Sequence, residues 1–168
     1  MTCRRLTGKG LGGTVLGMTM RRSLFAVLAL LFAFVVPAAG RAATVEPLTI
    51  VDSAGQRHLF QVELALTEEE RERGLMFRDH LAADGGMIFL YARPTAITMW
   101  MKNTPIALDM LFMDGHGTIT HIAADAVPYS LTYIPSGGPA VGVLEVAGGT
   151  VARLGIHVGD RVEFRAFH

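Results

Sequence analysis

Apolar and polar residues alternate along several short stretches of the chain, a pattern typical of strands with one buried face. The clearest stretch is residues 58–66, where Phe60, Val62, Leu64 and Leu66 share one face. Short apolar runs bounded by turn residues predict further strands at residues 48–51, 87–91, 97–102, 107–114, 118–124, 141–146 and 160–166. We expect a tight hairpin at 114–117 and a loop over residues 129–139, which contain Pro135, Gly137 and Gly138.

Two short helical segments interrupt this series of strands. Thr67 is followed three residues later by Glu70, which predicts a capping box and therefore a helix start. Gly74 is a natural stop for that helix, and a second helical turn is expected at residues 150–154. The predicted fold class is mainly β, an antiparallel sandwich or barrel with one or two short helices.

The N-terminal 43 residues have the pattern of a secretory signal peptide. Arg21 and Arg22 precede thirteen uncharged apolar residues, 24–36, and Pro37 and small residues follow. The run is shorter than the roughly 20 residues that cross a bilayer, so cleavage is favoured over a retained membrane anchor. We expect cleavage at about residues 40–43, a single domain over 44–168, and a secreted or periplasmic location. The start could be Met1, Met18 or Met20.

Charge and cysteine content narrow the function of the remaining domain. Six of the fifteen Lys and Arg residues precede residue 44, which leaves nine bases against fifteen acids and a net charge of −6. That balance argues against sequence-independent binding of nucleic acid. Because Cys3 is the only cysteine, the mature domain is cysteine-free and has no thiol nucleophile, thiolate ligand or disulfide.

Several strings of the chain resemble one family over residues 59–162. They are residues 71–78 (RERGLMFR), 86–89 (GMIF), 100–104 (WMKNT), 108–110 (LDM), 143–145 (VLE), Asp114 with Gly117, Gly155-Ile156 and Gly159-Asp160. Together they resemble domain of unknown function 192. The resemblance implies a small, mainly β, often exported domain, in a family without an established biochemical activity. It also implies proline before Leu108 and an aromatic residue before Val143, where this chain has Ala107 and Gly142.

Asp109 is the most informative polar residue because the strand around it, 106–113, is otherwise apolar. A buried carboxylate needs a partner, and Lys102 or Arg78 is the nearest candidate. In the structural interpretation, Asp109 accepts hydrogen bonds from the 103–105 turn. In the functional one, it lines a cleft beside Trp100, which shares a strand face with Lys102 and with it forms a ligand platform.

Glu145 is a second acid among apolar neighbours. It is a candidate for acid–base chemistry or a salt-bridge partner of Arg153 or Arg165. The candidate ligand-binding residues are therefore Arg78, Trp100, Lys102, Asn103, Asp109 and Glu145.

Three functions remain open from the sequence. We favour non-covalent binding of a small ligand or protein partner, with no catalytic residue, cofactor, resident metal, nucleic acid or membrane span. The alternative is a hydrolytic acid–base enzyme using Asp109, Glu145 and Lys102. A third is Cu(I) handling through Met99 and Met101, although methionine more often fills a core.

Overall fold

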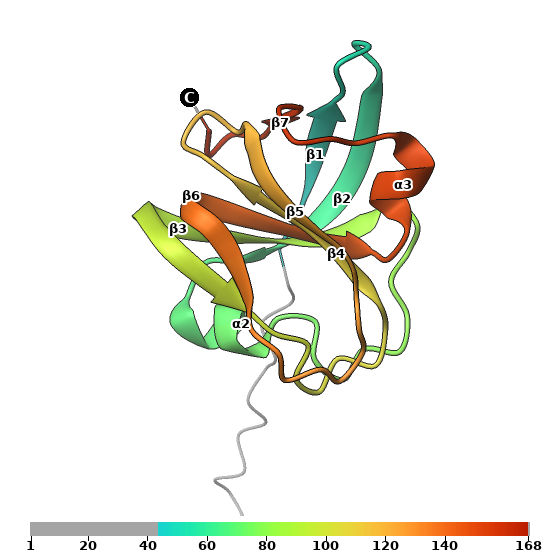
Figure 1. The fold of residues 1–168 in the computed structure, drawn as a ribbon, viewed down its shortest axis with the longest axis vertical. Coiled ribbons are helices and arrows are strands. Elements are labelled where there is room, and N and C mark those ends of the chain that lie inside the picture. The colour runs from blue at the N-terminus through green and yellow to red at the C-terminus, as the bar shows by residue number, and fades with distance from the viewer. Residues whose placement is uncertain (1–43, 168) are drawn as a thin grey trace, which may run out of the picture. The chain divides into compact units, whose positions relative to one another are not determined.

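Seven strands form one curled sheet in residues 44–167, the part of the chain that this computed structural model describes (Figure 1). The strands are β1 (Val45–Val51), β2 (Arg57–Ala65), β3 (Gly85–Met99), β4 (Leu108–Met113), β5 (Ile119–Ala126), β6 (Ile134–Ala147) and β7 (Arg161–Glu163). Two short helices, α2 (Glu68–Arg73) and α3 (Thr150–Leu154), lie at its margins. The predicted fold class, mainly β with two short helices, is confirmed.

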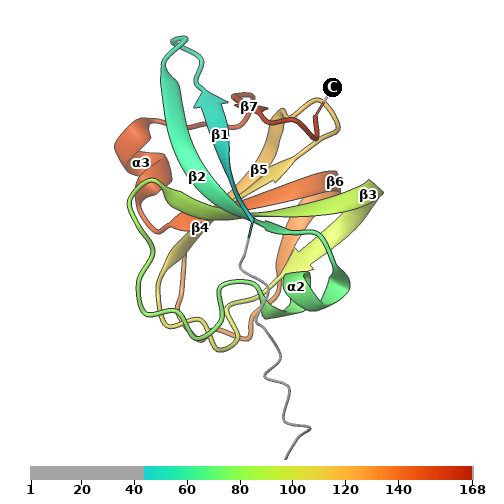
Figure 2. The same cartoon turned by 180° about the vertical axis from the view of Figure 1, so that it is seen from behind.

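The strand order is β5-β4-β6-β3-β2-β1-β7, and the two outer strands curl back toward each other. The turn before β5 meets β7 through a bridge between Thr118 and Arg161. The Ile119 amide also donates to the Asp160 carbonyl at 2.9 Å, and the Val162 amide to the Gly117 carbonyl at 2.8 Å. All neighbouring strands are antiparallel except β2 and β3, a parallel pair joined by a connection through α2. Figure 2 shows α2 and this connection from behind.

Strand alternation places two apolar clusters on the two faces of the sheet. On β6, Leu144 and Val146 pack with Leu48 and Ile50 in one cluster. Val143 packs with Met110 and Phe112 in the other, and Glu145 belongs to the same face as Val143 by alternation. The face on which a β6 residue lies therefore decides which cluster its side chain meets.

The predicted helix start is confirmed in detail. The Thr67 hydroxyl accepts the Glu70 amide at 3.2 Å, and the Glu70 carboxylate accepts the Thr67 amide at 2.9 Å. Gly74 ends the helix at φ +46°, and a Cβ there would lie 3.2 Å from the Phe89 ring. Glycine is therefore needed both for the backbone angle and for the close approach.

Three strand boundaries differ from the prediction. β3 continues past Pro94 because its register with β6 shifts between Leu90 and Thr95, so the proline is left out of the ladder. Residues 134–139, predicted as loop, are the first part of β6 and pair with the end of β3. β3 ends at Met99, so Trp100 and Lys102 lie in a loop rather than on one strand face.

Residues 42–168 form one compact unit. The predicted signal peptide, residues 1–43, lies outside the described residues. None of the helices in 44–167 is long and apolar enough to cross a membrane.

Candidate functional site

Asp109 is fully buried, and backbone amides surround its carboxylate. One oxygen accepts the amides of Asp125 at 2.8 Å and Gly149 at 3.2 Å, and the other accepts the Val151 amide at 2.7 Å. These donors come from β5 and from the start of α3. Asp109 therefore links β4, on which it lies, to β5 and α3. The prediction that Lys102 or Arg78 is its partner is wrong.

The two predicted basic partners are engaged elsewhere. Arg78 forms a bidentate ion pair with Glu63 on β2. The Lys102 ammonium lies 4.9 Å from the centre of the Trp100 ring. Asn103 adopts a positive φ of 55°, and its carbonyl accepts the Phe77 amide at 2.8 Å. Lys102 and Trp100 do meet, but loop geometry rather than strand alternation brings them together.

Asp109 and Glu145 lie on opposite faces of the sheet. Asp109 pairs in register with Val146, whereas Glu145 pairs with Met110 on one side and Met87 on the other. Since paired residues of neighbouring strands share a face, the two carboxylates cannot meet in one site. This geometry removes the acid–base pair on which the predicted hydrolytic enzyme depended.

Glu145 is only 4% exposed, yet it has no hydrogen bond or ion pair to any described residue. The other buried polar side chains, Thr104, Asp109, Ser136, Thr150 and Asp160, all have hydrogen-bond partners. No fully enclosed side-chain nitrogen or oxygen in the described chain lacks a partner, so the free Glu145 oxygens must reach an opening. Burial raises the pKa of Glu145 to about 8.

That opening is a small cleft of about 30 Å³. Its walls are residues 71–76 at the end of α2, together with Phe89, Met99, Trp100 and Thr104, and Glu145 lies among them. A typical small-molecule pocket measures roughly 300–1,000 Å³. The Glu145 cleft therefore accommodates one functional group of a ligand rather than a whole metabolite.

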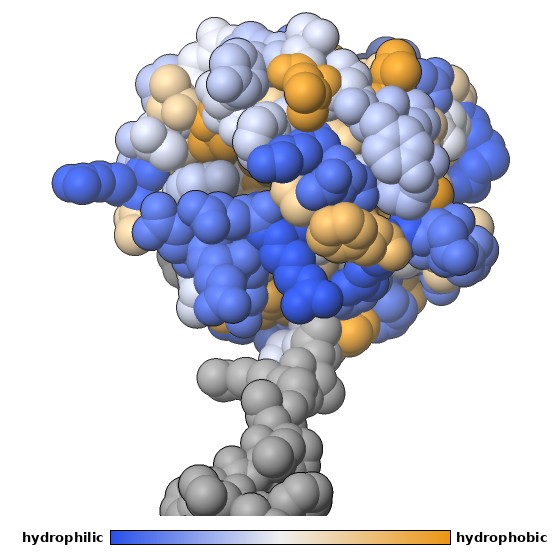
Figure 3. All heavy atoms as spheres, turned by 90° about the horizontal axis from the view of Figure 1, so that it is seen from below, coloured by the Kyte–Doolittle hydropathy of each residue, from blue (hydrophilic) through white to orange (hydrophobic). Residues whose placement is uncertain are grey.

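Exposed aromatic and apolar side chains lie on the loops that adjoin the cleft. The Trp100 ring stacks on Tyr133 at a centroid distance of 6.4 Å, and Phe77, Tyr129 and Leu131 are also exposed. The Met101 amide donates to Ser130 and the Tyr129 amide to Thr104, which holds the two loops together. Figure 3 views the side of the molecule that carries α2 and these loops; over the part of this face that is in view, hydrophilic residues separate the hydrophobic ones.

Unusual backbone angles concentrate in the same loops. Four non-glycine residues of the described chain have positive φ: Phe77, Asn103, Asp125 and Tyr129. Phe77 and Asn103 are joined by a backbone hydrogen bond, and Tyr129 is bonded to Thr104 beside the cleft. Such angles cost free energy and persist only where the surrounding structure enforces them.

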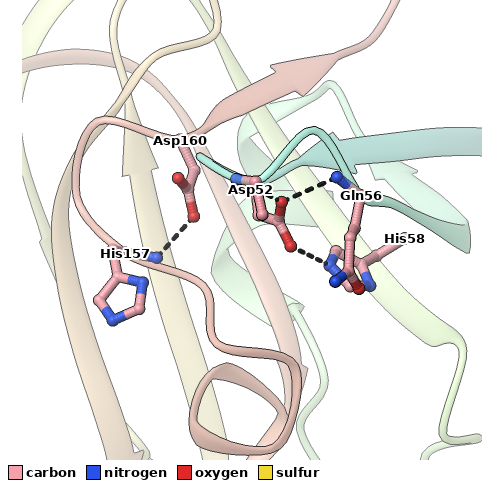
Figure 4. Close-up of polar contacts among 6 residues, drawn as sticks. Asp52, Gln56, His58, His157 and Asp160 are labelled. Carbon is pink, nitrogen blue, oxygen red and sulfur yellow. Dashed lines mark hydrogen bonds and ion pairs between the residues drawn. The ribbon is translucent and has the colours of Figure 1, made fainter.

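His58 at the start of β2 and His157 in the loop before β7 have structural roles (Figure 4). The Asp52 carboxylate accepts the Gln56 amide at 2.8 Å and bonds the His58 ring at 3.0 Å, and that bond lowers the pKa of Asp52. The Asp160 carboxylate accepts the His157 amide, while the His157 ring points away from it. Within residues 44–167, no three His, Cys, Asp or Glu side chains are grouped to hold a metal ion.

A larger open groove of about 520 Å³ lies beside β7. Of its charged walls, Glu163 pairs with Arg57 and Arg165 pairs with Glu46, and Arg161 is exposed. The charged side chains of the groove are exposed, so none of them is a buried group without a partner. We place the candidate site at the Glu145 cleft.

The methionines proposed for copper are core residues. Met101 is fully buried and Met99 is 9% exposed, and both pack in the cluster with Met110 and Phe112. Of these two methionines, only Met99 contributes to the cleft wall. Their packing accounts for the two thioethers without a metal.

Comparison with known proteins gives the family. The profile of domain of unknown function 192, described as an uncharacterized ACR, matches residues 49–164. The chain belongs to the domain of unknown function 192 family. No curated protein matches it.

Two solved structures are similar to this family member. A putative transcription regulator from Sinorhizobium meliloti 1021 is 44% identical, with a TM-score of 0.71, covering 72% of this chain and 94% of its own. A protein of unknown function from Novosphingobium aromaticivorans DSM 12444 is 46% identical, with a TM-score of 0.70, covering 76% of this chain and 89% of its own.

The strings that carry the resemblance to domain of unknown function 192 divide into two groups. Asp109, Asp114, Gly117 and Asp160 hold backbone amides or permit a close approach. Residues 71–76, Trp100, Thr104 and Glu145 instead line the cleft. Of the six predicted site residues, the structure brings Trp100 and Glu145 to one cleft, with Lys102 against the Trp100 ring. We did not predict from the sequence that residues 71–76 line the site. The signal was there, because residues 71–78 form one of the strings that resemble the family.

Proposed function

We propose that this member of the domain of unknown function 192 family is an exported domain that binds a ligand without covalent chemistry at the Glu145 cleft. One observation carries the proposal: Glu145 is the only buried polar side chain in the described chain without a partner. An unpaired buried carboxyl costs stability, so its presence at a cleft favours a functional role.

The size of the cleft and the character of its surroundings support binding of one group of a ligand. The free volume of about 30 Å³ admits a head group, while Trp100 and the exposed aromatic residues beside it offer surface for the rest. Interrupted hydrophobicity on this face argues against a large apolar protein interface. A small ligand is therefore favoured over a protein partner.

The name of the Sinorhizobium relative suggests another class, transcription regulation. The excess of fifteen acids over nine bases after residue 43 gives this domain a charge that repels phosphate. Binding of nucleic acid is therefore not part of the proposal.

Binding can be tested through Trp100, the only tryptophan in the chain. Residues 42–168, the compact unit, would be titrated separately with n-butylammonium, n-butanol, butyramide and butyrate up to about 50 mM, which fills a site of millimolar Kd. We expect at least one probe to change the Trp100 fluorescence and raise the Tm. Arg161→Gln, in the groove beside β7, is the control that should leave this response unchanged. If none of the four probes produces a response, the proposed function is wrong.

Export is tested independently of binding. We expect the protein recovered from the periplasm or medium to begin at about residues 40–43, as measured by intact mass. Recovery of the protein only in the membrane fraction, with residues 21–39 still attached, would contradict cleavage.

A further inference from the structure

We propose that the Glu145 cleft takes a primary ammonium group on an apolar stem, carried by a small alkylamine. This inference rests on the proposed function and adds the chemical class of the ligand. The Glu145 carboxyl supplies the counter-charge, Leu75, Phe89 and Met99 supply apolar contact for methylene groups, and the indole of Trp100 lies at the cleft.

The charges around Glu145 favour a cation over an anion. The Arg71 guanidinium donates through Nη1 to the carbonyls of Leu66 and Leu90 and lies 4.9 Å from the Tyr91 ring centre, so part of its donor set is held by the fold. Glu72 and Arg73 are exposed at the outer wall. Glu145 is the most deeply buried charged side chain of the cleft, so its carboxylate would repel an anion and attract a cation.

The shape of the cleft favours ammonium over guanidinium. A guanidinium is a wide, planar fork, whereas an ammonium is a compact point charge on a flexible stem. A free volume of about 30 Å³ suits the compact group.

The protein itself shows that this tryptophan accepts an ammonium. The Lys102 ammonium lies 4.9 Å from the ring centre of Trp100, within the range of a cation–π contact. Lys102 thus occupies a face of the indole that a ligand ammonium would also favour, and its like charge opposes a second cation nearby. Replacing Lys102 with an uncharged residue of similar length should therefore strengthen amine binding.

The ionisation of Glu145 gives the proposal a directional pH signature. The titratable and charged groups around it are Arg71, Glu72 and Arg73 from α2 and Tyr91 from β3, and β4 contributes only Met110. Lys102 lies over the ring of Trp100, which is part of the cleft wall. Burial raises the pKa of Glu145 to about 8, and the ammonium pairs with the ionised form. Affinity should therefore rise up to about tenfold per pH unit below 8 and level off above it, with proton release on binding.

The test compares four small probes of nearly equal size and one lysine peptide on residues 42–168, by Trp100 fluorescence and calorimetry between pH 6 and 9. The probes are n-butylammonium, n-butanol, butyramide, butyrate and an N-acetylated, C-amidated Gly-Lys-Gly peptide. The variants are Glu145→Gln, Lys102→Met and the control Arg161→Gln. Each variant is first checked for a cooperative thermal transition.

We expect n-butylammonium to bind best, with affinity rising toward pH 8. Glu145→Gln should weaken it at least tenfold at pH 8 and remove the pH dependence, Lys102→Met should tighten it severalfold, and Arg161→Gln should leave it unchanged. Binding of n-butanol or butyramide with no binding of n-butylammonium would overturn the ammonium assignment but leave the cleft as a site. Binding of the lysine peptide, with no binding of n-butylammonium, would overturn the proposal that the ammonium belongs to a small alkylamine. Failure of every probe would overturn the proposed function as well.

Discussion

Two acids that look alike in the sequence have opposite roles at the scale of single residues. Asp109 and Glu145 both stand among apolar neighbours, and both are buried. Three amides hold the Asp109 carboxylate, whereas the Glu145 carboxyl has no partner among residues 44–167. The hydrogen bonds of Asp109 stabilise the fold, whereas the buried Glu145 carboxyl destabilises it. Substituting the two side chains by their amides should therefore shift stability in opposite directions.

For Glu145→Gln we expect a higher free energy of unfolding at pH 8 than in the parent protein. The Glu145 pKa is raised from its usual 4.5 to about 8, so the folded state keeps a proton that the unfolded state releases between these values. Stability is therefore fully present below pH 4.5 and falls as pH rises toward 8, by on the order of 4 kcal/mol at most. Glutamine removes this slope. Urea unfolding at pH 5 and pH 8 measures it, and equal pH slopes in both proteins would contradict the prediction.

For Asp109→Asn we expect a loss of about 2–3 kcal/mol in the free energy of unfolding. One carboxylate oxygen accepts two amides and the other accepts one, and an asparagine NH₂ group cannot accept any of them. Whichever way the side chain amide is turned, at least one buried N–H loses its acceptor. The same urea experiment checks this, and an unchanged midpoint would show that the three bonds contribute little.

The sequence identifies these two acids as unusual but does not show what each one binds, because their surroundings come from distant parts of the chain. An acid in an apolar strand is visible from its neighbours, yet the Asp109 donors are residues 125, 149 and 151, far along the chain. Lys102 and Arg78 were favoured because they are near in sequence, whereas Arg78 pairs with Glu63 across the parallel connection. That parallel connection was not predicted, so this partner could not be found.

At the scale of elements, the strands and helices that depend on interactions between residues close in sequence were the ones predicted correctly. The β2 strand and the α2 helix follow from short-range patterns, alternation and a capping box, and both are confirmed. β3 and β6 extend beyond their predicted ends because Pro94 lies where the ladder is already irregular. One departure from the family pattern also has a long-range explanation: a Cβ at Gly142 would meet the Phe167 ring at 3.1 Å, so that ring occupies the space.

For Thr67→Ala we expect the helix that walls the cleft to weaken by about 1 kcal/mol. The substitution removes the hydroxyl that accepts the Glu70 amide and disrupts the capping box. Amide hydrogen exchange should speed up in residues 68–74 more than in the strands, since α2 contributes no buried side chain of its own. Thr132→Ala, at an exposed loop position, is the matched control. Faster exchange throughout the sheet would show that α2 is not a local unit.

At the scale of the whole molecule, the contact between the turn before β5 and β7 brings the two edges of the sheet together. Alternation and turn spacing predicted a mainly β barrel or sandwich, but only long-range pairing decides how the edges meet. Gly117 is the point of closest approach, because a Cβ there would lie 2.2 Å from the Val162 carbonyl oxygen. Its φ of +79° is also unfavourable for any other residue.

For Gly117→Ala we therefore expect a loss of about 3 kcal/mol or more, combining backbone strain with displacement of β7. The Val162 amide donates to the Gly117 carbonyl at 2.8 Å, so moving the turn also strains the bond that brings the edges together. Gly115→Ala is the matched control in the same hairpin, because a Cβ at Gly115 would meet nothing within 4 Å. Thermal unfolding should show a lower Tm in a single cooperative transition for Gly117→Ala and a nearly unchanged Tm for Gly115→Ala. Equal effects of the two substitutions would mean that the contact with β7 does not hold the sheet together.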